Sequence, residues 1–153
     1  MSVPRHTGSR VGPGEPLGVD EAMIHRLVHA FYGKVRADPA LGPIFNGAIS
    51  DWDVHLARMC DFWSSVMLMT GRYKGNPMGA HIQVGGIRPT HFARWLHLFR
   101  QTAGETCPPE VAALFDAKAQ NIARSLQLGI DASQGVLPAR PVSARVVGSG
   151  DLG

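Results

Sequence analysis

FYGKVRADPALGPIFN, residues 31–46 of the chain, holds the end of a predicted helix and the break that follows it. Before the break, apolar side chains recur at helical spacing from Ile24 to Val35, and Asp20 stands where an N-cap belongs. Glycines and prolines at 39–47 then interrupt this periodicity. The stretch therefore predicts an amphipathic helix that ends in an irregular connection.

Three further helices are expected beyond this break. A second helix should run from near Asp51 to Met69, where apolar positions again follow helical spacing. A third should follow Thr90 as its N-cap. A fourth should begin at Pro108 and Pro109, because the first turn of a helix tolerates proline. Few stretches alternate with a period of two, so we expect an all-α protein.

Residues 71–89 lie between the second and third expected helices and differ from both. They hold five glycines, two prolines and one histidine, and are too broken for a long helix. We expect something other than their own hydrophobic packing to order them. A bound cofactor is one candidate.

Glycine and proline also concentrate at both ends of the chain. Residues 1–18 contain seven of them, and residues 131–153 contain six and no aromatic residue. Such composition is typical of disordered segments. We therefore expect one domain at 19–130, flanked by a disordered N-terminal tail (1–18) and a disordered C-terminal tail (131–153).

The composition of the 153-residue chain excludes several classes of protein. With 44% hydrophobic and 18% charged residues, it can build a packed core. The net charge is only +3 and the arginines are scattered, so no nucleic-acid partner is expected. No apolar run approaches the roughly 20 residues of a membrane span. Cys60 and Cys107 are too few for a disulfide framework and indicate free thiols, with a single bridge as the alternative. A cytoplasmic protein without a membrane partner is expected.

Two histidines are candidates for chemistry. His55 follows Trp52 by three residues and precedes Met59 by four, which places it on or beside the apolar face of the second helix. It is either a hydrogen-bonded core histidine or a group that faces a pocket. His81 lies in the glycine-rich stretch, where it is either a surface loop residue or an iron ligand.

Other candidate groups are weaker when each is taken alone. Tyr32 and Trp95 each carry a hydrogen-bond donor on an apolar face, and each could equally be an ordinary core or boundary residue. His25 and His29 lie four residues apart without a third metal ligand, which favours a solvated pair. Walker, G-x-G-x-x-G and G-x-S-x-G motifs are absent.

Taken together, four fragments resemble a known family. They are FYGKVRADPALGPIFN at 31–46, WDVH at 52–55 with DFW at 61–63, YKGNPMGAH at 73–81, and HFARWLHLF at 91–99. In this order and spacing they resemble a group III truncated haemoglobin, over about residues 20 to 128.

The resemblance implies a truncated globin, a two-over-two helical sandwich around haem b. His81 matches the proximal ligand of the haem iron. Tyr32 and Trp95 match distal donors to a bound ligand, and His55 matches the distal histidine that gates entry. Haem contacts are expected from Phe31, Phe45, Met59, Phe62, Trp63 and Phe92, with Arg72, Tyr73 and Lys74 toward the propionates.

The resemblance also implies a function. A monomer or weak dimer should bind O2, NO, CO or peroxide, and hydrogen-bond donors that slow ligand release suit chemistry or sensing better than bulk oxygen transport. Turnover would be NO detoxification by dioxygenation, or peroxidase-like reduction, with a separate reductase, since no flavin or NAD domain is fused. One alternative is a haem-based gas or redox sensor or interaction module without catalysis. Another is a helical binding module without haem.

Overall fold

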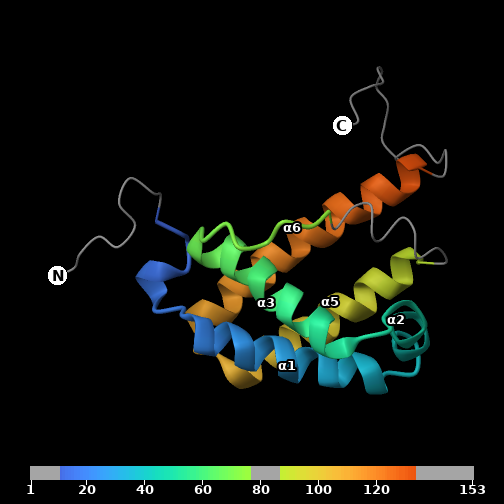
Figure 1. Ribbon diagram of the computed structural model, residues 1–153, viewed down its shortest axis with the longest axis horizontal. Coiled ribbons are helices and arrows are strands. Elements are labelled where there is room, and N and C mark those ends of the chain that lie inside the picture. Colours follow the sequence, from blue (N-terminus) through green and yellow to red (C-terminus); the bar gives the residue numbers. More distant parts are fainter. Residues whose placement is uncertain (1–10, 77–86, 134–153) are drawn as a thin grey trace.

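The computed structural model describes residues 11–76 and 87–133, and over these residues the chain is helical without strands. The elements are a short 3-10 helix, η1 (Glu15–Leu17), and the helices α1 (Glu21–Ala37), α2 (Gly42–Ala48), α3 (Trp52–Leu68), α5 (Pro89–Thr106) and α6 (Pro109–Ser133) (Figure 1). The expected all-α class is confirmed.

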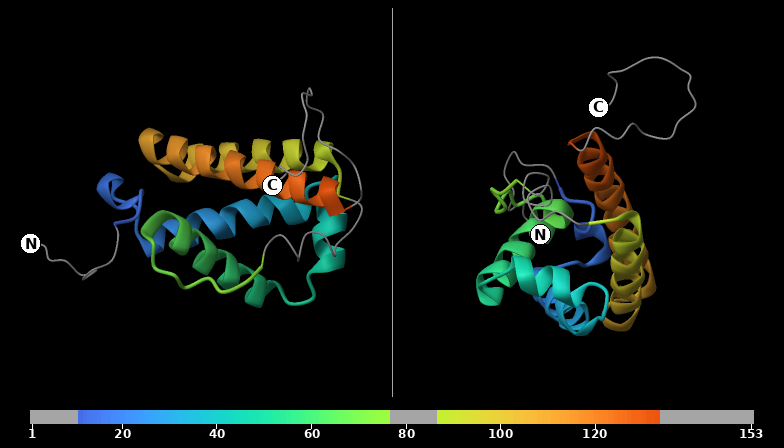
Figure 2. Two further views of the ribbon diagram at one scale, coloured as in Figure 1. Left: turned by 90° about the horizontal axis from the view of Figure 1, so that it is seen from above. Right: turned by 90° about the vertical axis from the view of Figure 1, so that its right-hand side faces the viewer.

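The long helices pack in two layers of two. α5 and α6 lie side by side in one layer, and α1 and α3 form the other (Figure 2). α1 contacts both α3 and α5, so it joins the two layers. This is the two-over-two arrangement that the family resemblance implies.

Side-chain caps explain where α1 and α3 begin. The Asp20 carboxylate accepts a hydrogen bond from the backbone N–H of Met23 at 2.9 Å. The Asp51 carboxylate accepts one from Val54 at 3.2 Å. Each bond satisfies an N–H group that has no partner within its helix. Both starts agree with the expectation from sequence.

The expected cap of α5 is wrong by two residues. The helix begins at Pro89, with Arg88 as its N-cap, so Thr90 lies inside the first turn. Proline suits this position because its missing N–H would have had no helical partner there. The ring nitrogen Nδ1 of His91 instead accepts a hydrogen bond from the backbone N–H of Arg88 at 2.9 Å.

The glycine- and proline-rich stretch after α1 is also more ordered than expected, because it forms α2. Pro43 occupies the first turn of that helix. A Cβ atom on Gly42 would lie 2.7 Å from the carbonyl oxygen of Arg36, so glycine permits a close approach of the two backbones. The glycine- and proline-rich stretch therefore contains the start of α2 as well as the break after α1.

Residues 11–18, which precede the expected domain start at residue 19, also pack against the helices. The Gly14 N–H donates to the Met67 carbonyl at 2.8 Å, and a Cβ on Gly12 would lie 2.5 Å from Cα of Leu68. Residues 11–18 thus pack against the end of α3, and placing them in a disordered tail was wrong. At the other end, α6 continues past residue 130 to Ser133.

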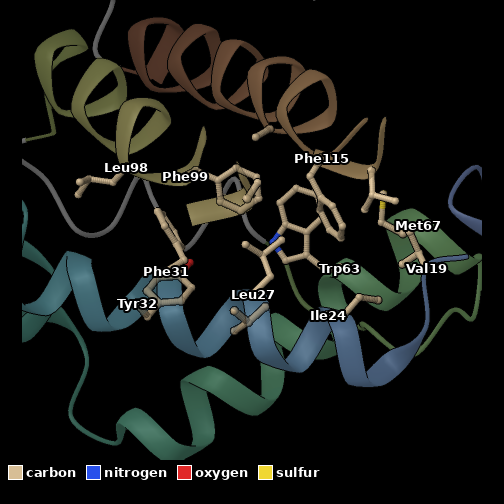
Figure 3. Packing of buried hydrophobic residues seen from close by; sticks show 14 of the residues in the cluster. Val19, Ile24, Leu27, Phe31, Tyr32, Trp63, Met67, Leu98, Phe99 and Phe115 are labelled. Atoms are coloured by element: carbon tan, nitrogen blue, oxygen red, sulfur yellow. The ribbon is translucent and has the colours of Figure 1, made fainter. Parts of the chain in front are cut away.

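Aromatic side chains fill the space between the layers. Trp63 of α3 stacks on Phe99 of α5 with ring centroids 5.2 Å apart, and Phe115 of α6 packs against Trp63 at 5.3 Å (Figure 3). Trp95 of α5 also stacks on Phe99, with ring centroids 5.5 Å apart. These ring contacts thus form a continuous series from Phe115 of α6, through Trp63 and Phe99, to Trp95 of α5.

Among the described helices, none combines the length and apolar character needed to cross a membrane.

Candidate functional site

A cavity of about 280 Å³ opens beside this aromatic core. Side chains from α1, α2, α3, α5 and α6 line it, together with residues of the connections between helices. Most of these side chains are aliphatic or aromatic, with a few polar groups among them. Such a wall, with a small set of convergent polar groups, is typical of a binding site for a largely apolar small molecule.

Tyr32 brings a buried hydroxyl to the cavity from α1, and it is only 5% exposed. Burial raises the pKa of Tyr32 far above its ordinary value, and a hydrogen bond with the Trp95 side chain lowers that pKa by a smaller amount. The phenol is therefore neutral at physiological pH. Because an indole N–H can only donate, the Tyr32 oxygen is the acceptor in this hydrogen bond.

His55 reaches the same part of the cavity from α3. Its ring meets Tyr32 edge-on, with centroids 5.0 Å apart, and lies 5.4 Å from Trp52. The Trp52 indole N–H donates to Oδ1 of Asn46 at 3.2 Å, and the Arg36 guanidinium lies 4.6 Å from the Trp52 ring centroid. These contacts tie the start of α3 to α1 and α2, and so position His55 beside Tyr32.

The remaining expected cofactor contacts divide into two groups. Five line the cavity: Phe45, Met59, Phe62, Trp63 and Phe92. Phe31 does not, because it precedes Tyr32 by one residue and so lies about 100° further round α1. Its ring packs behind the wall, 5.3 Å from Trp95 and 5.1 Å from Phe99. Phe31 therefore packs against Trp95 from behind the cavity wall.

The residues expected near haem propionates also separate. Tyr73 lines the cavity, whereas Arg72 does not and lies 3.4 Å from a carboxylate oxygen of Glu21. Lys74 lies outside the cavity wall, in a shallow pocket that also includes Arg72 and Tyr73. Only Tyr73 of the three therefore reaches the cavity itself.

Arg58 is a cavity residue that the sequence analysis missed. It lines the wall, and its guanidinium carbon lies 5.9 Å from the ring centroid of Tyr73. Its spacing from His55, three residues along α3, could have indicated it, because such residues share one face of a helix. It is the strongest cationic candidate on this wall for an acidic group.

His81, the expected proximal ligand, lies outside the described residues. Within 11–76 and 87–133, no group of three or more histidine, cysteine or carboxylate side chains could hold a metal ion. The cavity walls are aromatic and aliphatic with Arg58 among them, a lining that suits a largely apolar small molecule carrying an acidic group.

Comparison with known proteins identifies the family. No family model matches the chain. The chain is 34% identical over 113 residues to group 3 truncated hemoglobin ctb of Campylobacter jejuni subsp. jejuni serotype O:2, covering 71% of this chain and 89% of that protein. The crystal structure of a group III truncated hemoglobin from Campylobacter jejuni matches with a TM-score of 0.68, 34% identity and the same coverage. With its two-over-two helices and its aromatic cavity, the chain belongs to the group III truncated haemoglobins.

Proposed function

We propose that the cavity holds haem b, with His81 as the proximal ligand, and that the protein binds O2 and other small diatomic ligands there. The observation that carries this proposal is the meeting of Tyr32, Trp95 and His55, from three different helices, in an otherwise apolar cavity. Membership of the truncated haemoglobin family supports the cofactor.

The cavity wall fits the proposed cofactor. Phe45, Met59 and Phe62 offer apolar surface to a macrocycle, and the flexible Met59 thioether adapts to its shape. Arg58 and Tyr73 are proposed to contact the propionates. Haem, when bound, would supply an iron able to bind O2, NO, CO or peroxide.

Tyr32 is proposed to control how long a ligand stays. Its neutral hydroxyl is buried, accepts from Trp95, and donates its proton toward a ligand that carries partial negative charge. One such charge-assisted hydrogen bond contributes about 1.5–3 kcal/mol, which corresponds to roughly a 10- to 100-fold slower release.

Slow release suits chemistry better than bulk oxygen transport. We propose that the protein turns over NO by dioxygenation, or peroxide by reduction, with electrons from a separate reductase. Exclusion of water by the apolar wall would strengthen the hydrogen bonds that Tyr32 and Trp95 make inside the cavity.

The experiment that tests the proximal ligand replaces His81 by glycine. We expect His81→Gly to lose stable haem loading, or to regain it only with added imidazole. The matched control is His25→Ala, which removes an exposed histidine of α1 and should load haem like the wild-type protein. An unchanged proximal-histidine spectrum in His81→Gly would remove this residue from the site.

A further inference from the structure

Asp38 is a buried carboxylate whose partners come from two directions. Oδ2 accepts hydrogen bonds from the backbone N–H groups of Ala40 at 3.0 Å and Leu41 at 2.9 Å. Oδ1 accepts from Nε of Arg94 at 2.8 Å and lies 2.7 Å from its Nη2. The side chain of Asp38 is only 2% exposed. One anion therefore joins the end of α1 and the start of α2 to α5.

The side-chain and backbone partners of Asp38 either line the cavity or neighbour a residue that lines it. Leu41 is the N-cap of α2 and lines the cavity, as does Phe45 one turn further along. Arg94 immediately precedes Trp95, whose side chain contacts Tyr32 of α1. The carboxylate thus lies where small movements of α5 or α2 against α1 would change the cavity.

A small number of hydrogen bonds to the Asp38 carboxylate stabilises this junction of α1, α2 and α5. A buried carboxylate is costly unless donors satisfy its oxygens, and here two backbone groups and a two-pronged guanidinium contact do so. By contrast, a second ion pair between these parts of the described chain joins Lys34 of α1 to Glu105 of α5 at 2.6 Å, between side chains 29% and 55% exposed. Exposed pairs of that kind constrain helices weakly.

We propose that Asp38 and Arg94 are positioning residues: their ion pair sets how Trp95 lies against Tyr32, and thereby sets ligand affinity. The inference rests on the proposed ligand-binding function. Neither residue is among those that line the cavity, so each acts through a neighbour: Arg94 through Trp95, and Asp38 through the α2 start and Arg94.

Two variants and a matched control test the proposal. Asp38→Asn keeps an oxygen for the backbone N–H groups but removes the charge, and Arg94→Gln removes the guanidinium. Lys34→Gln breaks the second α1–α5 ion pair, away from the cavity. The readouts are the O2 dissociation rate and the C–O stretching frequency of the CO complex, which reports on donors near the ligand.

We expect Asp38→Asn and Arg94→Gln to release O2 about two- to thirtyfold faster, the range that coupling through packed networks spans. Their C–O stretch should move to higher frequency, because donors held less firmly polarise CO less. The double variant should change little beyond either single variant, since both remove one interaction. Lys34→Gln should match the wild-type protein.

Rates and frequencies equal to those of Lys34→Gln would overturn the proposal. If Asp38→Asn fails to fold, Arg94→Gln and Arg94→Lys carry the same comparison, because the Arg94 side chain is 44% exposed. Arg94→Lys keeps the charge without the two-pronged contact and should lie between wild type and Arg94→Gln.

A readout without haem separates this inference from the proposed function. The near-ultraviolet circular dichroism of the haem-free protein reports how its aromatic side chains pack, Trp95 with Tyr32 and Phe99 among them. Asp38→Asn and Arg94→Gln should change that signal, and Lys34→Gln should not. A wild-type protein that binds no haem contradicts the proposed function, whereas four identical dichroism spectra contradict the positioning role.

Discussion

Tyr32 of α1 and His55 of α3 meet edge to face, with ring centroids 5.0 Å apart and ring planes at 89°. The contact brings two polar side chains from different helices into one cavity whose other walls are mostly apolar. Burial keeps the Tyr32 phenol neutral, and the Trp95 indole occupies its oxygen as a donor. We propose that the Tyr32 hydroxyl donates its proton to a bound ligand.

Replacing this hydroxyl should speed ligand release. Tyr32→Phe keeps the ring contact with His55 but removes the donor, so we expect O2 to dissociate about 10- to 100-fold faster. Stopped-flow displacement of O2 by CO measures the rate. Tyr73→Phe, which removes the chain's other tyrosine hydroxyl, is the control and should change the rate much less. An unchanged rate in Tyr32→Phe would exclude its hydroxyl as the donor.

The buried phenol should also resist ionisation. Burial raises the pKa of Tyr32 well above the ordinary tyrosine value of about 10. Tyr32 is the one tyrosine left in Tyr73→Phe, and its phenolate absorbance should appear only well above that pH in the folded protein. Since the unfolded chain ionises first, this group favours unfolding as the pH rises past about 10. Phenolate absorbance near pH 10 in the folded variant would show that Tyr32 is solvated.

Asp38 should stabilise the fold except in acid. Hydrogen bonds from Arg94 hold the pKa of Asp38 below its usual value, with the N–H groups of Leu41 and Ala40 adding to the effect. The carboxylate therefore stabilises the fold fully above its unfolded pKa of about 3.9, and this contribution is lost as the pH falls through the lower folded value.

Urea unfolding of wild type and Asp38→Asn across pH tests this sign. We expect the variant to be about 1–3 kcal/mol less stable at neutral pH, with the difference shrinking below about pH 4. Glu105→Gln, in an exposed ion pair, should cost less than about 1 kcal/mol. A difference for Asp38→Asn that stays constant down to pH 2 would refute the assignment.

The packing of residues 11–18 on α3 can be tested with two glycines. A Cβ on Gly12 would lie 2.5 Å from Cα of Leu68, so Gly12→Ala should lower the free energy of unfolding by about 1–3 kcal/mol. Gly33 lies within α1 with open space around its Cβ position, so Gly33→Ala should raise it by about 0.5–1 kcal/mol. Equal effects in urea unfolding would show that Gly12 makes no close contact.

Much of the helical framework follows from local sequence. Asp20 caps α1 as expected, and α3 begins as expected near Asp51, which caps it, because an N-cap depends on a side chain and a backbone N–H three residues away. α2 was missed because glycine and proline, here Gly42 and Pro43, are typical both of an irregular break and of the first turn of a helix. Only the close approach of the backbone at Gly42 to the backbone at Arg36, which the sequence does not show, distinguishes the helical turn from the break.

The candidate site was predictable in its aromatic members and less so in its charged ones. Tyr32 and Trp95 were identified through the family resemblance, and the structure brings both to the cavity. Arg58 carries only a weak local signal, its spacing of three residues from His55, and Arg94 carries none, because an arginine on a helix is usually solvated. Their contacts with Tyr73 and Asp38 depend on how separate segments pack, which spacing along one helix does not specify.

The central claim is a histidine-ligated haem with an accessible ligand position, and an absorption spectrum tests it most directly. The purified protein, supplied with haemin, should be recorded in the ferric state, after dithionite reduction, and after addition of CO. We expect a strong Soret band that shifts sharply with CO. A colourless protein that takes up no haemin and shows no Soret band would contradict the account.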